Sequence, residues 1–194
     1  MYKRQLRYNE RIKINGIEID DESLLETFEM IDEVRGDTTL TYFEFATLSA
    51  FYLFSKSNLD VAVLEVGLGG RLDATNIVDS DISIITSIGI DHTEFLGNTI
   101  DSIALEKAGV MRPFKTCIYA QENPPAALLK YAKNKSVNLL IHNNDYRVSL
   151  GSSNWSLKSK NNSINEIPNL KMIGDYQYNY AGASLLALDA ILPE

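Results

Sequence analysis

Residues 63–76, VLEVGLGGRLDATN, put a carboxylate near the end of an apolar run and follow it with three glycines. Glu65 stands within the last two residues of that run. The glycines permit a sharp turn with positive φ, but they do not explain the carboxylate. A carboxylate on a buried strand costs several kcal/mol unless a cation or hydrogen-bond donors satisfy it. We therefore expect Glu65 to meet a partner where the run ends.

The same glycines resemble part of a dinucleotide-binding turn. Gly67 and Gly69 match the first two glycines of Gly-x-Gly-x-x-Gly, but Leu72 occupies the third position. The motif should also open a helix, whereas RLDATN is typical of a loop. The spacing therefore favours a simple turn over a dinucleotide fingerprint.

A second apolar run, residues 82–88, is followed by the polar sequence Asp91, His92, Thr93 and Glu94. If both runs are parallel strands, Glu65 and His92 emerge at the same edge of the sheet, where ligands of open parallel sheets gather. A lone histidine is commonly a satisfied hydrogen-bonding residue. Its pairing with a carboxylate at one edge favours a metal site instead.

Lys107 is the third candidate. In the expected helix at residues 99–109, Ile100, Ile103 and Ala104 form an apolar stripe, and helical spacing puts Lys107 on the same face. One alternative is that the aliphatic part of the side chain crosses the apolar face and the ammonium group reaches water. The other is that the amine stays near the covered face with a lowered pKa and is partly neutral. A neutral amine can take up carbon dioxide and become a carbamate, which is a carboxylate-like metal ligand.

The elements that must position these residues follow from periodicity and caps. The expected helices are residues 20–34, 41–56, 99–109, 124–135 and 175–192, and the expected strands are 60–66, 82–88 and 115–120. Gly109 is a C-cap signal. Apolar runs without alternation suit a mostly parallel sheet flanked by helices, an α/β fold. We expect one domain over residues 1–194, with a polar loop or hairpin around 151–165.

Composition narrows the class of protein. A formal net charge of −8 and a pI near 4.8 speak against a nucleic-acid surface. No run approaches the roughly 20 apolar residues of a membrane span, and the polar, basic start is unlike a secretory signal, so we expect a cytoplasmic protein. The single cysteine, Cys117, lies in an apolar run and is expected to be buried.

Five segments in order, LRYNERIKING, YFEFATLSAF, VAVLEVGLGGRLDATN, SIGIDHTEFLGNT and EKAGVMRP, resemble the folylpolyglutamate synthase/dihydrofolate synthase family of the Mur ligase superfamily. The resemblance covers roughly residues 6 to 192. It implies the central, ATP-binding, P-loop-type domain of a Mur ligase. GLGGRLDATN and DHTEFLG are similar to the folate branch, and a ligase of peptidoglycan precursors remains the alternative.

The resemblance implies a ligase of folate biosynthesis that uses ATP to join L-glutamate to dihydropteroate or to a reduced folate, through an acyl phosphate. It implies that Glu65 and His92 bind Mg²⁺ and that Lys107 serves a second metal as a carbamate. Because histidine is an unusual ligand for magnesium, the ligand types allow Mn²⁺ equally. The family also implies a monomeric parent enzyme.

Three further residues are expected near the nucleotide. Arg71 and Asp73 should order the glycine-rich loop, through each other or around the ligands. Gln177 matches the family's Gln-x-x-Asn-Ala segment beside the adenine, but the expected asparagine falls on Tyr180. That departure leaves the adenine contact open.

No Gly-Lys-Ser/Thr phosphate loop occurs in the 194 residues. The resemblance therefore implies a partial central domain, truncated at both ends and inactive alone. A non-catalytic module that retains the fold is the remaining alternative.

Overall fold

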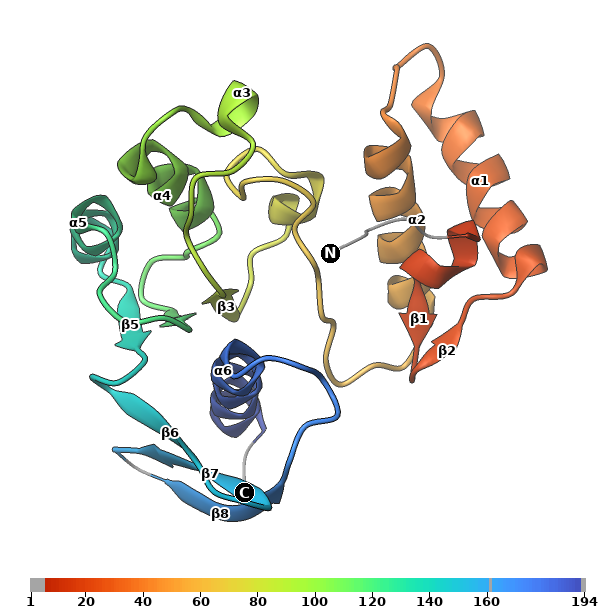
Figure 1. Cartoon of the computed structure of the whole chain (residues 1–194). Helices are drawn as coiled ribbons and strands as arrows, with labels where there is room; N and C mark the ends of the chain where they lie inside the picture. Colours follow the sequence, from red (N-terminus) through yellow and green to blue (C-terminus); the bar gives the residue numbers. More distant parts are fainter. Residues whose placement is uncertain (1–5, 161, 193–194) are drawn as a thin grey trace. The chain divides into compact units, whose positions relative to one another are not determined.

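The computed structural model describes residues 6–160 and 162–192, and the chain divides into two compact units, Met1–Gly67 and Leu68–Glu194. Figure 1 labels most helices and strands of both units. No helix in the described part of the chain is long and apolar enough to span a bilayer.

The first unit is built on two helices, α1 (Asp21–Arg35) and α2 (Tyr42–Lys56). Both begin where the sequence predicts. The Asp20 carboxylate accepts a hydrogen bond from the amide of Ser23 at 2.8 Å. Thr41 and Glu44 form a reciprocal capping box, in which the Glu44 carboxylate accepts from the Thr41 amide at 2.7 Å. These caps satisfy amides that the first helical turn leaves without partners.

A short hairpin and a helical turn complete this unit. The turn η1 (Tyr8–Arg11) leads into the antiparallel strands β1 (Lys13–Ile14) and β2 (Ile17–Glu18). The ring of Tyr8 packs edge-on against Phe28 of α1 and Tyr42 of α2, with centroids 5.1 and 4.9 Å apart. Burial, together with the neighbouring Tyr42, raises the pKa of Tyr8 to about 12. The aromatic contacts therefore tie η1 to both helices.

The strand predicted at residues 60–66 is wrong, because this segment has no strand in the structure. A β-strand exists only where a neighbouring chain completes its hydrogen-bond ladder, and an apolar run cannot supply that partner itself. Val63 is 86% exposed and Glu65 is also exposed. The expectation that Glu65 is a buried carboxylate at a strand end is therefore wrong as well.

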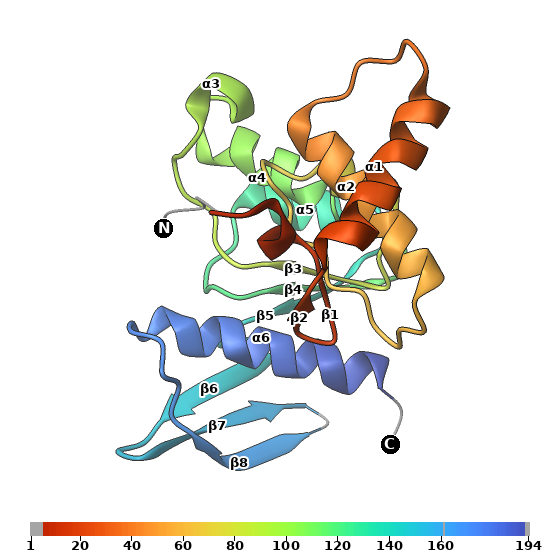
Figure 2. The same cartoon turned by 90° about the vertical axis from the view of Figure 1, so that its right-hand side faces the viewer.

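The second unit contains the predicted parallel sheet. Its strands are β3 (Ile82–Ile85), β4 (Thr116–Tyr119) and β5 (Asn138–Ile141), in that order and all parallel. Strands were predicted from the sequence at the positions of β3 and β4, and no strand was predicted at the position of β5. The helices α4 (Ile100–Ala108) and α5 (Ala126–Asn134) cover one face, and α6 (Tyr176–Ile191) covers the other (Figure 2). The turn η2 (Ala74–Ile77) and the short helix α3 (Thr93–Leu96) lie in the connections.

Alternate residues of β4 face the two helical layers. Cys117 and Tyr119 belong to the apolar cluster with α4 and α5, while Ile118 belongs to the cluster with α6. Cys117 is fully buried, as predicted, and burial raises the pKa of its thiol to about 11. Both faces of this sheet are therefore covered, which explains why its strands read as continuous apolar runs.

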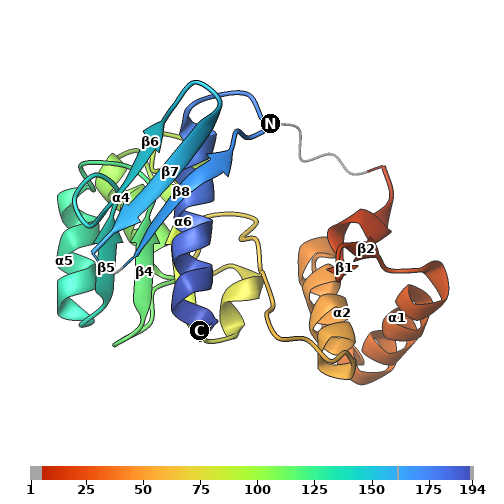
Figure 3. The same cartoon turned by 90° about the horizontal axis from the view of Figure 1, so that it is seen from below.

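A second, antiparallel sheet packs on the side of α6 that faces away from the parallel sheet (Figure 2), and Figure 3 shows its three strands from below. Its strands β6 (Tyr146–Leu150), β7 (Asn154–Ser159) and β8 (Ser163–Pro168) lie in chain order. The polar segment 151–165 thus forms a hairpin, one of the two predicted forms. Trp155 is buried, and its indole nitrogen donates to the carbonyl of Pro168 at 3.0 Å. A few alternating apolar residues therefore anchor a segment that is mostly serine and asparagine.

Candidate functional site

The glycine-rich loop lies in direct contact with the end of α4. A Cβ atom on Gly70 would come within 2.8 Å of the Val110 side chain and 3.0 Å of the Glu106 carbonyl oxygen. A Cβ atom on Gly109 would lie 2.4 Å from the Cα atom of Arg71. Real Cβ atoms do not approach backbone this closely, so glycine at both positions lets the two segments touch.

This contact revises the expected role of Gly109. The helix α4 ends just before it, as predicted, but its φ of −59° is right-handed. A glycine that ends a helix for conformational reasons adopts the left-handed region. Gly109 is therefore required by the close approach of Arg71 and not by the turn.

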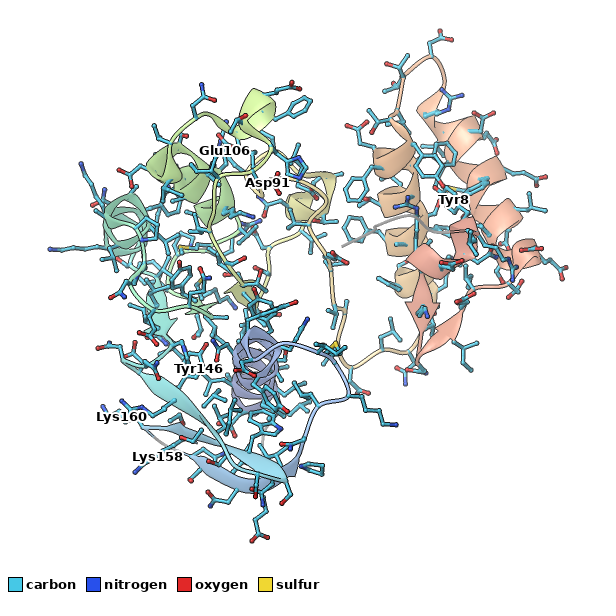
Figure 4. The ribbon with its side chains drawn as sticks, viewed as in Figure 1. Tyr8, Asp91, Glu106, Tyr146, Lys158 and Lys160 are labelled. Carbon is cyan, nitrogen blue, oxygen red and sulfur yellow. The ribbon has the colours of Figure 1, made fainter. Side chains whose placement is uncertain are left out.

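Arg71 joins the loop to α4 through both its backbone and its side chain. Its amide donates to the Glu106 carbonyl at 2.9 Å, and its guanidinium donates to both carboxylate oxygens of Glu106, at 2.9 to 3.2 Å. The Glu106 carboxylate raises the pKa of Arg71. Figure 4 labels Glu106 on α4. The prediction that Arg71 orders the loop holds, with Glu106 as its ionic partner.

Asp73 orders the next turn of the loop. One carboxylate oxygen accepts from the Leu68 amide at 3.1 Å, and the other accepts from the amide and hydroxyl of Thr75 at 3.0 and 2.7 Å. The residue is thus the N-cap of η2. Its ordering role agrees with the prediction, and its contact with a cofactor stays a prediction.

Arg112 holds the far end of the same loop and was not singled out from the sequence. Its guanidinium donates to the carbonyls of Gly109, Asn76 and Val78 at 2.8 to 3.2 Å and forms an ion pair with Asp79. In the sequence, Arg112 stands in the tripeptide Met-Arg-Pro at residues 111–113, shortly after the end of α4, and this is where it could have been found. The loop is therefore fixed at both ends against the segment 106–112.

His92 immediately precedes α3, in a left-handed conformation with φ of 50°. Its side chain is exposed, with Nε2 3.6 Å from a carboxylate oxygen of Asp91. The side chain of Leu96, on the same short helix, reaches within 2.9 Å of where a Cβ atom of Gly69 would lie. The His92 segment therefore joins the glycine-rich loop in the second unit.

Lys107 is half-buried on α4, between the fully buried Ala104 and Ala108. This agrees with the prediction that it lies toward the covered face. Its carbonyl oxygen is 3.1 Å from the position a Cβ atom of Gly70 would take. The loop, α3 and α4 thus form one contiguous region that carries His92 and Lys107.

Glu65 belongs to the first unit, Met1–Gly67, so its convergence with His92 and Lys107 stays a prediction. Among residues 6–160 and 162–192, no three histidine, cysteine, aspartate or glutamate side chains are grouped to hold a metal ion. Lysine is outside that set of residue types. A site of the predicted kind would therefore depend on a modified Lys107.

Two residues of α6 bear on the predicted nucleotide contact. Gln177 lies in the first turn of α6 and is half-buried. Its backbone amide donates to the backbone carbonyl of Gly174 at 3.0 Å. Tyr180 packs against the apolar cluster around α6, with its ring 5.6 Å from that of Tyr176. The position where the family has asparagine is thus occupied by a packed aromatic ring.

His142 is a candidate that sequence reasoning missed. It directly follows β5 and is only 6% exposed. The signal was present, because a histidine at the end of an apolar run is the same pattern that singled out His92. In the structure its backbone amide donates to the carbonyl of Tyr119, twenty-three positions earlier, and its ring lies 5.4 Å from that of Tyr146.

Comparison with known sequences identifies relatives. The family described as Mur ligase middle domain matches residues 5–187. The dihydrofolate synthase/folylpolyglutamate synthase of Haemophilus influenzae is 45% identical over 84% of this chain and 37% of its own length. The protein of the same name from Escherichia coli is 40% identical over 84% of this chain and 39% of its own. The chain thus spans less than half the length of these relatives.

Solved structures agree with the sequence relatives. E. coli FolC in complex with DHPP and ADP superposes with a TM-score of 0.90 at 40% identity, over 97% of this chain and 45% of that one. The Yersinia pestis bifunctional folylpolyglutamate synthase/dihydrofolate synthase complexed with AMPPNP and Mn gives 0.89 at 39% identity, over 100% and 46%. The predicted resemblance and the predicted α/β fold are both confirmed. The chain belongs to the Mur ligase middle domain family.

Proposed function

We propose that this chain is part of an ATP-dependent ligase that joins L-glutamate to dihydropteroate or to a reduced folate. The observation that carries the proposal is the 45% identity with the Haemophilus influenzae dihydrofolate synthase/folylpolyglutamate synthase. Structures of similar proteins support the substrates, since one contains DHPP and ADP and another contains Mn, AMPPNP and L-glutamate.

The proposed reaction forms one amide bond for each ATP. The pteroate or folate carboxylate attacks the γ-phosphorus of ATP, which gives an acyl phosphate and ADP. The glutamate amine then attacks the acyl carbon, loses its proton, and expels inorganic phosphate from a tetrahedral intermediate. Since ATP and a carboxylate are both anions, positive charge is needed where they meet.

The donor chemistry of three residues fits a hard divalent cation. Glu65 supplies a carboxylate, His92 an imidazole, and Lys107 a carboxylate-like group once carbamylated. Oxygen donors with one nitrogen suit Mg²⁺ or Mn²⁺. Such an ion would neutralise charge on the phosphoryl group. In this proposal the pair Arg71–Glu106 and the capping carboxylate of Asp73 keep the neighbouring loop in place.

A chimaeric enzyme tests the proposal. Residues 6–192 of this chain replace the equivalent segment of the E. coli relative, and glutamate addition to dihydropteroate and to tetrahydrofolate is followed by mass spectrometry alongside phosphate release. We expect one phosphate for each glutamate added. A folded chimaera that binds ATP but adds glutamate to neither acceptor would overturn the proposal.

The metal residues are tested in the same chimaera. Glu65→Gln, His92→Gln and Lys107→Gln should each lower kcat by about 100-fold, the scale for losing one group that stabilises developing charge. Glu29→Gln and Lys130→Gln, at exposed helix positions, are the matched controls and should retain full activity. Equal activity of a metal-residue variant and its control would remove that residue from the proposed site.

A further inference from the structure

Two cationic residues stand directly opposite each other on neighbouring antiparallel strands, Arg147 on β6 and Lys158 on β7. Residues in this register share one face of a sheet, and like charges there destabilise it. A third cation, Lys160, follows directly after β7. Figure 4 shows Lys158 and Lys160 near the same end of the antiparallel sheet. The chain thus gathers three positive charges at one place, although its formal net charge is −8.

These three cations have no carboxylate partner in the described part of the chain. Arg147, Lys158 and Lys160 form neither an ion pair nor a side-chain hydrogen bond among residues 6–160 and 162–192. Elsewhere the same chain does pair exposed cations with carboxylates, as Lys115 does with Asp81 at 2.8 Å. The positive charge at the antiparallel sheet is therefore available to an external anion.

The three cations line a recess of about 850 Å³ within the second unit. The recess opens beside β5 and β6, which are edge strands of the two sheets, and beside the last turns of α6. Leu140 and Leu186 supply apolar lining, and Asn138 and Ser159 supply neutral hydrogen-bonding groups. The volume is within the range of small-molecule sites, so the cations border a space that a ligand can occupy.

Two carboxylates also line the recess, and both already accept hydrogen bonds from neutral groups. Asp145 accepts from the backbone amide of Ile141 at 2.8 Å and from the side chain of Asn144 at 3.1 Å. Asp189 accepts from the side chain of Asn162 at 2.8 Å. Three cations against two carboxylates give the lining a net positive charge. The sign of this charge is opposite to that of the chain as a whole.

We propose that Arg147, Lys158 and Lys160 bind the phosphate group of a small ligand in this recess. A phosphate group carries a charge of about −1.5 to −2 at pH 7, which calls for more than one cation, whereas a single carboxylate is matched by one. The guanidinium has the planar fork that binds two phosphate oxygens, and the ammonium groups act as point charges. The site shares no residue with those proposed for ligation and goes beyond the proposed function.

A titration of the ¹⁵N-labelled chain followed by NMR tests the proposal. Inorganic phosphate and glucose 6-phosphate are added separately at constant ionic strength, with glucose and chloride as controls for the sugar and for the charge. We expect the backbone amide signals of Arg147, Lys158 and Lys160 to shift saturably with a phosphate probe. The probe that saturates at the lower concentration identifies the free ion or the ester as the source. Signals that do not saturate, or that move equally with chloride, would mean an adventitious ion only and would overturn the proposal.

Two double variants with the same change in charge separate this site from general electrostatic attraction. Arg147→Gln with Lys158→Gln should weaken binding of the phosphate probe by about 10-fold, because two charge-assisted contacts are lost. Lys130→Gln with Lys133→Gln, at exposed positions of α5 outside the recess, is the matched control. It should change the affinity by less than about 2-fold, since distant exposed charges are screened. Equal weakening in both double variants would contradict the assignment.

Thermal unfolding keeps the test independent of misfolding. Because Arg147 and Lys158 repel each other, their double variant should melt no lower than the parent chain in phosphate-free buffer. The phosphate probe should raise the melting temperature of the parent and of the α5 control but not that of the site variant. Lys160→Gln leaves the strand pair intact and should weaken binding about 3-fold. An equal rise in melting temperature for every variant would overturn the proposal.

Discussion

The contact between Gly109 and Arg71 predicts a large effect of one methyl group. In Gly109→Ala the new Cβ atom would lie 2.4 Å from the Arg71 Cα and Cβ atoms and 2.8 Å from its amide nitrogen. An ordinary contact between such atoms is about 3.5–4.0 Å. Since two of these three atoms are backbone, the loop must retreat by about 1 Å, because no side-chain rotation can relieve the overlap.

This displacement of the loop should lower the free energy of unfolding. Overpacking a tight contact costs about 1–3 kcal/mol. Two hydrogen bonds lie across the contact, from the Arg71 amide to Glu106 at 2.9 Å and from the Asn76 side chain to the Gly109 carbonyl at 3.0 Å, and each is worth about 1 kcal/mol. Replacing glycine returns about 0.5–1 kcal/mol through the unfolded chain. We expect a net loss of about 3 kcal/mol.

Thermal and urea unfolding followed by circular dichroism measure this loss. For a unit the size of Leu68–Glu194, 1 kcal/mol corresponds to about 4 °C, so Gly109→Ala should melt about 12 °C below the parent chain. Gly89→Ala is the matched control, because its Cβ would meet nothing within 4 Å and its backbone is not left-handed. Melting of the two variants within about 2 °C of each other would refute the reasoning.

Three further predictions concern charged and titratable groups. Arg112→Met should cost about 1–3 kcal/mol in urea unfolding, because it leaves three loop carbonyls, two of them partly buried, without their donor, and a loss below about 0.5 kcal/mol would contradict this. Glu106→Gln should leave the urea midpoint almost unchanged, since Arg71 is 54% exposed and solvent weakens the pair; a lowered midpoint that persists in 1 M salt would contradict this. Burial lowers the pKa of His142 in the folded chain; Arg147 lowers it further, and Glu122 opposes the shift. As the pH falls, the unfolded chain therefore takes up the His142 proton before the folded chain does. The free energy of unfolding should then decrease as the pH drops below about 6.5. His142→Leu should flatten that slope relative to the parent chain, and an unchanged slope would refute the assignment.

The helices were predictable because their determinants are local. Thr99 caps α4 through the Ser102 amide at 3.1 Å, and the spacing from Ile103 to Lys107 sets the half-burial of the lysine. Both features can be read within eight residues of sequence. The strand expected at 60–66 failed for the opposite reason, because an apolar run shows a tendency to pair but not whether a neighbouring strand is present.

The candidate site was only partly predictable for related reasons. The loop residues Arg71 and Asp73 were correctly expected to order their segment, but the partner of Arg71 is Glu106, thirty-five positions away. Gly109 was recognised as a helix end, while its true constraint comes from another segment. His142 carried the same signal as His92, yet only the fold shows that one imidazole is buried and the other exposed.

The meeting of Gly70 and Gly109 with the opposing backbones has a consequence for related sequences. The glycine-rich turn and the end of α4 lie so close together that neither position has room for a Cβ atom. A side chain at either position would separate the glycine-rich turn from α4, so relatives that keep this contact should have glycine at both positions.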